Sequence, residues 1–282
     1  MLYLEFAGGL GNQMFQYATY RNLLENGKEI KCAVTNDNNG SFPFRLDIFP
    51  NVKIEFVTEN DHYGDMKDKY KNRNIFQKII NKIVPNSAVV YREKEKKVFD
   101  GKIFEIDNKI ISGYFQGIDY IIPVGEMLRK EFVFPYGEKK LQSMITELPK
   151  DTASIHVRRG DYLQFDKIYG GICTEEYYRK AILYMKKNGV KNWVIFSDDI
   201  DWAKNVFGIL NPVFVEKSWF SHYQDWYDMC LMSACENNII ANSSFSWWGA
   251  WLNKNPNKKV VCPKKWNNIM IKNMACDDWI AI

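Results

Sequence analysis

The densest group of reactive side chains is the sequence HVRRGDY, from His156 to Tyr162. It places two guanidiniums, an imidazole and a carboxylate directly after the apolar run Ala153 to Val157, which predicts a buried strand. In open α/β sheets, ligands gather outside the carboxyl ends of the strands, and the planar fork of arginine suits phosphate oxygens. The pattern therefore predicts an anion site. A solvated turn closed by an Arg–Asp ion pair is the alternative.

A second apolar run ends in paired acids. In IFSDD, Asp198 and Asp199 follow the run that starts at Ile195. A carboxylate at this place can accept two hydrogen bonds from the N1–H and N2–H2 edge of guanine, and a helix N-cap is the alternative role. Asp199 and Asp201 also form a D-x-D pair of the kind that holds a divalent cation. We discount a metal site, because we expect Asp201 inside the first helical turn and because two arginines already supply positive charge.

A glycine-rich turn stands near the N-terminus. The sequence GGLGNQ, Gly8 to Gln13, lies between a strand-like run and a helical pattern. Glycines let backbone N–H groups approach a ligand, and a helix N-terminus favours a negative partner. A dinucleotide fingerprint is not matched, because the third glycine of G-x-G-x-x-G would fall on Met14. A tight strand-to-helix connection without a ligand is the other interpretation.

A third polar segment, NSSFSWWGAWL, runs from Asn242 to Leu252 and follows an apolar run. Small hydroxyl residues that open a helix offer backbone and side-chain donors to phosphate oxygens, and a serine can cap the same helix at once. The tryptophans Trp247, Trp248 and Trp251 fall on more than one helix face. We therefore expect them to pack in the core or between domains rather than to stack on sugars.

The composition is that of an ordinary globular chain. Its 282 residues suit two domains of about 100–200 residues each, and its 46% hydrophobic content can bury substantial cores. A net charge of +4 is too small for general nucleic-acid binding and fits local anion sites better. The six cysteines form no C-x-x-C pair, which indicates neither a zinc site nor a disulfide framework and favours a reducing compartment. No run approaches the ~20 apolar residues of a membrane span, and no signal peptide is visible. We expect a cytoplasmic protein and leave open a peripheral membrane association through basic residues.

Strand-like and helix-like segments alternate along the chain, which predicts an α/β fold with largely parallel sheets covered on both faces. The predicted strands cover residues 2–6, 29–34, 52–57, 109–114, 152–157, 193–197, 212–215, 238–241 and 259–262. The predicted helices cover residues 11–25, 174–187, 202–208, 225–236 and 245–253, with Gly27 ending the first and Thr174 capping the second.

The sequence Pro149-Lys150-Asp151 breaks both helix and strand and predicts the connection between two domains, 1–148 and 149–282. From Thr58 to Lys97 the chain is polar and lysine-rich and ends in a charge run that starts at Arg92. We interpret that run as a solvated helix face or insertion, with a polybasic contact to an anionic surface as the minority alternative.

Taken together, four segments resemble the ordered motifs of the α-1,2-fucosyltransferase family. They are GGLGNQMFQYA from Gly8, HVRRGDY from His156, FSDD from Phe196 and NSSFSWWGAWL from Asn242, and GYFQ from Gly113 resembles a further family segment. The resemblance implies a GT-B-type fold, with two Rossmann-like domains facing each other across a cleft. It also implies an inverting, metal-independent transfer of L-fucose from GDP-β-L-fucose to the 2-hydroxyl of a terminal galactose. The first domain would then lie on the acceptor side, and the second would bind the GDP-sugar without any further cofactor.

The family's H-x-R-R-G-D motif carries over residue by residue, with Arg158 as the expected diphosphate ligand. Asp161 is a candidate base by its chemistry, although we favour a role in orienting Arg158 or Arg159. The predicted donor-binding residues are Gly9, Gly11, Asn12, Gln13, His156, Arg158, Arg159, Asp198, Asp199, Ser243, Ser244, Phe245 and Ser246.

One departure from the family stands out, because a histidine often precedes the family's IIANSSFSWWG run and this chain has Asn237 and Asn238 there. It leaves the details of the donor pocket open. Two other functions also stay open. One is a non-catalytic GDP-sugar or glycan-binding protein on the same scaffold, and the other is a nicotinamide oxidoreductase using the Gly8 to Gly11 turn. The expected acceptor is a galactose-terminated glycan of bacterial surface polysaccharide, with a lipid-linked form left open.

Overall fold

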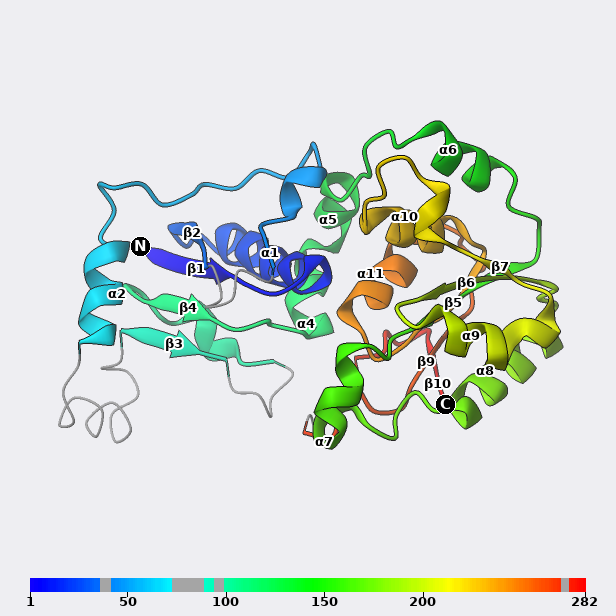
Figure 1. The fold of residues 1–282 in the computed structure, drawn as a ribbon. Helices are drawn as coiled ribbons and strands as arrows, with labels where there is room; N and C mark the ends of the chain where they lie inside the picture. The colour runs from blue at the N-terminus through cyan, green and yellow to red at the C-terminus, as the bar shows by residue number, and fades with distance from the viewer. Residues whose placement is uncertain (36–41, 73–88, 94–98, 270–273) are drawn as a thin grey trace. The chain divides into compact units, whose positions relative to one another are not determined.

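The structure is a computed structural model that describes residues 1–35, 42–72, 89–93, 99–269 and 274–282. The chain divides into two units, Met1–Phe132 and Val133–Ile282. Each unit is built on a parallel sheet, which confirms the predicted α/β class (Figure 1). Part of the charge run that starts at Arg92 lies outside the described residues.

The first unit holds four parallel strands in the order β2-β1-β4-β3. The strands are β1 (Leu2–Phe6), β2 (Ile30–Val34), β3 (Val90–Arg92) and β4 (Ile110–Ser112). The α-helices include α1 (Leu10–Glu25), α2 (Tyr63–Lys71), α4 (Ile118–Ile121) and α5 (Gly125–Glu131). Gly27 ends α1 as predicted: its φ is +73°, its N–H donates to the Leu24 carbonyl, and the Lys28 N–H donates to the Leu23 carbonyl. This is the Schellman arrangement that satisfies the last carbonyls of a helix.

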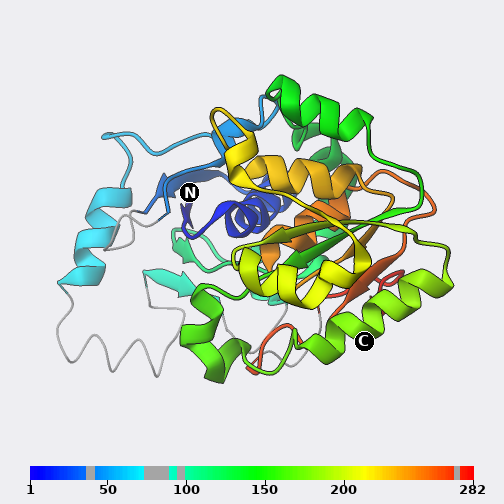
Figure 2. The same ribbon diagram turned by 45° about the vertical axis from the view of Figure 1, so that its right-hand side comes forward.

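Side chains alternate between the two faces of β1. Tyr3 lies against Tyr63 of α2 with ring centroids 5.7 Å apart, and the Tyr63 hydroxyl donates to Glu5 at 2.9 Å. The alternating residues Leu2, Leu4 and Phe6 are buried on the other face, which α1 covers. Figure 2 shows α2 in cyan and α1 in dark blue as separate helices of this unit.

The strand predicted over residues 52–57 is wrong, because this segment makes only an isolated bridge between Phe56 and Cys32. Hydroxyl groups of α1 hold its backbone instead. The Lys53 N–H donates to the Tyr17 hydroxyl at 3.4 Å, and the Glu55 N–H donates to the Tyr20 hydroxyl at 3.2 Å. These N–H groups are therefore satisfied without a strand ladder.

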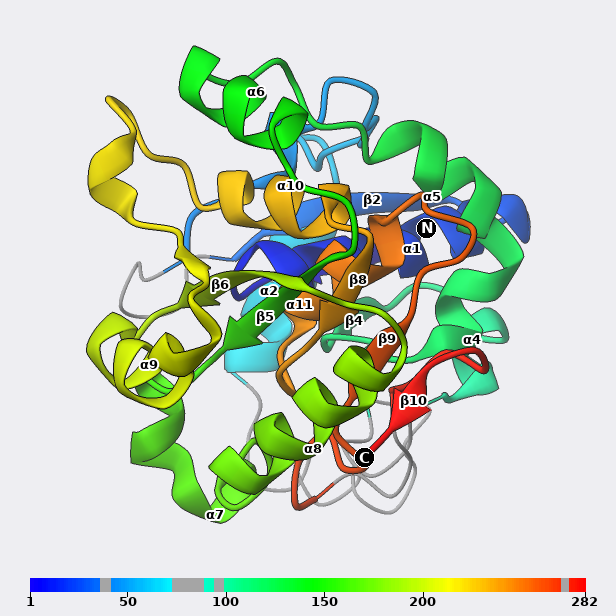
Figure 3. The same ribbon diagram turned by 90° about the vertical axis from the view of Figure 1, so that its right-hand side faces the viewer.

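The second unit holds six strands in the order β10-β9-β8-β5-β6-β7, all parallel (Figure 3). The strands are β5 (Thr152–Val157), β6 (Asn192–Ser197), β7 (Val213–Phe214), β8 (Asn237–Ile239), β9 (Val260–Cys262) and β10 (Ile280–Ala281), and the helices are α6 (Lys139–Thr146), α7 (Asp166–Tyr169), α8 (Glu175–Lys187), α9 (Ile200–Phe207), α10 (Trp226–Ala234) and α11 (Ser244–Leu252). The predicted strand 212–215 shrinks to the two residues of β7. Strands β3 and β10 were not predicted.

Helices cover both faces of this sheet. Ile155 and its alternating neighbours on β5 share a core with Tyr178 of α8 and Phe207 of α9. Ser154 faces the other side, where its Oγ accepts a hydrogen bond from Asn238 Nδ2 at 2.8 Å. The same amide donates to the Met232 carbonyl of α10, so this face carries α10. Thr174 caps α8 as predicted and accepts from the Tyr177 N–H.

The division between the units falls before α6, whereas the predicted boundary at 148/149 falls after it. The segment leading into α6 packs on α10: Phe134 stacks on Trp226 with centroids 5.8 Å apart, and Leu141 is buried. A Cβ added at Gly137 would lie 3.3 Å from the Trp226 ring. These aromatic contacts place α6 in the second unit.

Candidate active site

Three neighbouring strands of the second unit end in the polar segments that the sequence singled out. Arg158 follows β5, Asp198 follows β6, and Ser243 lies a few residues beyond β8. Because β5 lies between β8 and β6 and all three are parallel, these segments meet at the carboxyl edge of one sheet.

Arg158 binds two carboxylates at once. Its Nη2 lies 2.8 Å from Asp161 Oδ1, and its Nη1 lies 3.1 Å from Asp198 Oδ2. The Asp161 pair is the ion pair weighed as an alternative from the sequence, and the favoured role of Asp161 in orienting Arg158 stays a prediction. The Asp198 pair ties the loop after β5 to the loop after β6.

Asp198 uses both of its oxygens inside the protein. Oδ1 accepts the Arg159 backbone N–H at 2.8 Å, while Oδ2 pairs with Arg158. A Cβ added at Gly160 would lie 2.9 Å from Oδ2, so glycine lets the carboxylate close onto the turn. The guanine contact predicted for Asp198 stays a prediction, and a ligand there would have to share these oxygens.

Asp199 is the N-cap of α9, the role weighed as an alternative from the sequence. Its Oδ1 accepts the Trp202 N–H at 3.2 Å, and its Oδ2 lies 3.0 Å from Arg159 Nε. The Arg159 guanidinium also lies over the Trp202 ring, 4.3 Å from the centroid. Arg159 is thus held in place by a carboxylate and an aromatic face.

Asp201 lies in the first turn of α9, as expected. Among the residues that the structure describes, no three His, Cys, Asp or Glu side chains gather in a group able to hold a metal ion.

His156 is buried beside this cluster, with 8% of its surface exposed. Burial, together with the Arg158 charge, lowers its pKa to about 3, so the imidazole is neutral at physiological pH. Its Nδ1 has no hydrogen-bond partner among the described residues, and its ring lies 5.9 Å from the Phe245 ring at the start of α11. A neutral imidazole leaves the positive charge of the site to the arginines.

The start of α11 lies in the same unit. Ser243 is its N-cap residue and makes no side-chain capping bond, so the capping role weighed for serine is absent at this position. The Ser246 hydroxyl is fully buried and donates to the Ser243 and Ala241 carbonyls at 3.3 and 3.4 Å. The backbone N–H groups of the first turn are donors that this helix start can offer to an anion, and the donor contacts predicted for Ser243, Ser244, Phe245 and Ser246 stay predictions.

The three tryptophans of α11 are buried in the core, as expected. Trp247 Nε1 donates to the Met274 carbonyl at 2.7 Å, and Trp248 lies nearly perpendicular to Trp247 with centroids 5.0 Å apart. They fix the helix rather than line a sugar site.

Two residues that the sequence did not assign to the site hold its loops together. The Tyr162 hydroxyl donates to the Asn242 carbonyl at 3.0 Å, which joins the loop after β5 to the segment after β8. The Asn242 side chain donates to the Trp266 carbonyl and accepts from Cys173. Tyr162 and Asn242 both lie inside the motifs that carry the family resemblance. Nothing else in the sequence indicated that they belong to the site.

In the first unit, the glycine turn and the GYFQ segment come together. Gly8 has φ +75°, and a Cβ there would lie 2.8 Å from Asn12 Nδ2 and 3.0 Å from the Tyr114 ring. Asn12 Oδ1 accepts a hydrogen bond from Gln116 Nε2 at 2.7 Å. Two motifs far apart in the sequence thus form one structure at the carboxyl ends of β1 and β4.

Gln13 is buried and shapes this turn. Its Nε2 donates to the Gly8 and Pro43 carbonyls at 2.7 and 2.9 Å, and its Oε1 accepts the Arg45 N–H at 2.9 Å. The donor contacts predicted for Gly9, Gly11, Asn12 and Gln13 stay predictions.

The whole chain matches one known protein family. The family described as Glycosyl transferase family 11 matches residues 1–282. The chain belongs to glycosyltransferase family 11. The resemblance found in the motifs is thereby confirmed, and the protein is a glycosyltransferase.

Three relatives are similar to the chain over different shares of its length. The chain is 30% identical to the O-antigen biosynthesis glycosyltransferase WbnK of Escherichia coli, over all of both chains. It is 33% identical to an α-1,2-colitosyltransferase of Escherichia coli, over 92% of this chain and 90% of that one. It is 23% identical to human galactoside α-(1,2)-fucosyltransferase 1, over 50% of this chain and 42% of that one. Within the described residues, no helix is both long and apolar enough to cross a membrane.

Proposed function

We propose that the protein transfers L-fucose from GDP-β-L-fucose to the 2-hydroxyl of a terminal galactose on a glycan, with inversion and without a metal ion. The observation that carries this proposal is the Arg158 guanidinium, fixed by Asp161 and Asp198 at the carboxyl end of β5. Family membership and the α-1,2-transferring relatives support the linkage.

In the transfer, the bond between the anomeric carbon and the β-phosphate oxygen breaks, and the electron pair leaves with GDP. The galactose 2-hydroxyl attacks the opposite face of the anomeric carbon and loses its proton, so the β-linked donor gives an α-linked product. Negative charge therefore develops on the diphosphate while positive charge develops on the sugar. Groups already aimed at the leaving oxygens lower this barrier most.

Each of the two ion pairs of Arg158 uses one terminal nitrogen. A guanidinium carries five N–H donors, so Arg158 keeps donors that can bind the diphosphate. We assign Arg159 to the same anion through its remaining donors and the first-turn N–H groups of α11 to a phosphate oxygen. The neutral His156 would then bind the donor by hydrogen bonding instead of charge.

The colitosyltransferase relative supports GDP-colitose as a second candidate for the donor sugar nucleotide, since it shares 33% identity over most of both chains. Colitose is L-fucose without its 3-hydroxyl, so a single oxygen separates the two donors. A site that binds that hydroxyl would discriminate strongly against the deoxy sugar, whereas an apolar contact would accept both.

The test is to incubate the purified chain with GDP-fucose or GDP-colitose and a panel of β-galactosides, with and without EDTA. We expect fucose transfer that EDTA does not slow, and an α-1,2 linkage in the product by NMR. Loss of activity in EDTA would overturn the metal-free mechanism. Binding of GDP-fucose without release of GDP would favour the non-catalytic alternative.

A further inference from the structure

The GYFQ segment presents a tyrosine ring beside the glycine turn of the first unit. Tyr114 lies two residues beyond the end of β4 and is 46% exposed. A Cβ added at Gly8 would lie 3.0 Å from its ring, so the ring leans on the bare backbone of the turn. Strands β1 and β4 are adjacent and parallel (Figure 1), and ligands of parallel sheets gather at the carboxyl ends of the strands. Tyr114 therefore lies where a ligand of this unit is expected.

The backbone that carries Tyr114 is held in a costly conformation. Phe115 has φ +53°, a region that bulky residues rarely enter, while its ring is buried against Tyr120 with centroids 5.7 Å apart. Glu93 Oε2 accepts the backbone N–H groups of both Tyr114 and Phe115 at 2.8 Å. These two anchors turn Phe115 inward and Tyr114 outward. Because such strain persists mainly where binding or catalysis uses it, the exposed ring of Tyr114 points to a ligand.

The surroundings of the glycine turn are neutral. The exposed Phe42 ring would lie 3.8 Å from a Cβ at Gly9. Asn12 Nδ2 would lie 2.8 Å from a Cβ at Gly8, and Asn12 Oδ1 accepts a hydrogen bond from Gln116. Two aromatic rings and two amide side chains thus stand around this turn, and none of the four carries a formal charge. They suit a neutral ligand that has an apolar face and hydroxyl groups.

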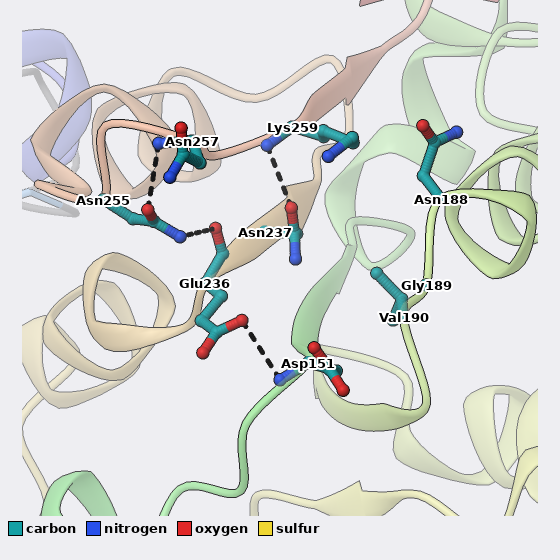
Figure 4. Close-up of a pocket in the computed structure, with 9 residues that line it drawn as sticks. All are labelled: Asp151, Asn188, Gly189, Val190, Glu236, Asn237, Asn255, Asn257 and Lys259. Atoms are coloured by element: carbon teal, nitrogen blue, oxygen red, sulfur yellow. Dashed lines mark hydrogen bonds between the residues drawn. The ribbon is translucent and has the colours of Figure 1, made fainter.

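The polar pocket of the second unit has neither this chemistry nor this location. It lies where β5, β8 and β9 begin, and Asp151, Glu236 and Lys259 stand immediately before these strands (Figure 4). Within the described part of the chain, none of the residues that line it is aromatic. It also lies at the amino edge of its sheet, whereas ligands gather at the carboxyl edge.

We infer that the Tyr114 ring binds the terminal galactose of the acceptor by stacking on the apolar face of the sugar. In β-galactose the 4-hydroxyl is axial, so the hydrogens on C3, C4 and C5 lie on one face and form an apolar patch. A fixed tyrosine ring offers a flat contact area to that patch at a low cost in conformational entropy. The reacting 2-hydroxyl is equatorial, so stacking leaves it accessible at the edge of the sugar.

The inference rests on the proposed function, in which galactose is the neutral reactant and the charged donor is assigned to the second unit. Three variants test it. Tyr114→Ala removes the ring, and Tyr114→Phe keeps the ring and removes only the hydroxyl. Tyr136→Ala is the matched control, because Tyr136 is 89% exposed and lies outside the residues assigned to the site. Circular dichroism spectra and melting curves confirm that each variant is folded.

Binding to the full chain is measured by saturation-transfer NMR without GDP-fucose, with methyl β-galactoside and its 4-epimer, methyl β-glucoside. We expect the galactoside to bind more tightly, with the strongest saturation on its H3, H4 and H5. KM is then measured with GDP-fucose present. Tyr114→Ala should raise the KM for the galactoside about tenfold and leave the KM for GDP-fucose unchanged. Tyr114→Phe and Tyr136→Ala should behave as wild type.

An unchanged galactoside KM in Tyr114→Ala would overturn the inference. An equal loss in Tyr114→Phe would also overturn it, since the hydroxyl and not the ring would then be the contact. A rise in the KM for GDP-fucose alone would place the fucose ring on Tyr114 instead, because L-fucose has the same relative configuration as galactose. If the wild type forms no product, the proposed function fails. The NMR comparison of wild type with Tyr114→Ala, which needs no turnover, still decides the stacking.

Discussion

The Arg158 guanidinium lies 3.1 Å from the Asp198 carboxylate, and this pair joins the ends of two neighbouring strands. The arginine is therefore positioned before any ligand arrives. It reaches solvent too, since its side chain is 35% exposed. A fixed yet accessible guanidinium at the carboxyl edge of a parallel sheet supports the proposed diphosphate site.

Replacing Arg158 with alanine should lower kcat by about 10²–10³, because one charge-assisted contact to the transition state is lost. The melting temperature should change little, since the side chain is half-buried and its pairs are partly solvated. Arg179→Ala is the control, because Arg179 is exposed and, within the described residues, pairs only with the neighbouring Glu176 at 3.0 Å. Unimpaired turnover by Arg158→Ala would remove this residue from the mechanism.

Replacing Asp161 with asparagine keeps an oxygen near Arg158 Nη2 and removes the charge. If Asp161 only orients the arginine, kcat should fall about tenfold and the pH profile should keep its shape. A general base contributes about 10²–10⁴ in rate, so a larger loss with a displaced pH profile would assign Asp161 to proton transfer instead. Asp201→Asn, at an exposed position of α9, should leave both quantities unchanged.

His156 should make the protein less stable in mild acid. Its pKa in the folded protein is about 3, below the ordinary 6.5, so between these values the unfolded chain binds the extra proton. Stability from this group is therefore full above pH 6.5 and falls as the pH drops. At pH 5 the loss is about 2 kcal/mol relative to pH 7.5. Urea unfolding isolates this contribution: on going from pH 7.5 to pH 5, the unfolding free energy of the wild type should change about 2 kcal/mol less favourably than that of His156→Gln.

Asp228 should have the opposite effect and make the folded protein more stable in mild acid. Burial raises its pKa to about 7. In the part of the chain that the structure describes, its Oδ1 has no hydrogen-bond partner, and its Oδ2 accepts from the Tyr223 hydroxyl at 2.8 Å. A raised pKa means that the folded state holds the proton between pH 3.8 and 7. Stability from this group therefore increases as the pH falls through that range. Asp228→Asn keeps an acceptor for Tyr223 and should lose this gain, about 2 kcal/mol at pH 5, in the same unfolding series.

Gly8 should tolerate alanine less well than Gly27 does. Both have φ near +75°, but a Cβ at Gly8 would lie 2.8 Å from Asn12, whereas nothing lies within 4 Å of one at Gly27. Gly27→Ala should cost about 1 kcal/mol of unfolding free energy through the backbone alone, and Gly8→Ala should cost more. Equal costs would mean that Asn12 moves aside without penalty.

Long apolar runs made much of the fold predictable. The strand Leu2–Phe6 is mostly apolar, and the strand Thr152–Val157 carries an apolar residue at every second position; a polar turn follows each of them. Strands of two or three residues, such as Val90–Arg92 and Ile280–Ala281, are too short to show such a pattern of apolar residues. The segment 52–57 alternates as a strand would, yet the N–H groups of Lys53 and Glu55 bond to tyrosine hydroxyls that no local pattern could reveal.

The residue types of the site were visible in the sequence, but their pairing was not. The motifs indicated that Arg158, Asp161 and Asp198 serve one site, and the structure brings them together. That the Asp198 carboxylate also binds the Arg159 N–H depends on the close approach at Gly160, which is a property of the folded turn.

The burial of α11 has a consequence for the energetics of donor binding. From Ser246 to Leu252 every residue of this helix is buried, and Trp247 is tethered to the Met274 carbonyl. A helix so anchored cannot slide or rotate when an anion meets its first turn. Its amide dipoles are thus preorganised, and the entropy that a looser loop would lose on capturing a nucleotide was already given up when the chain folded.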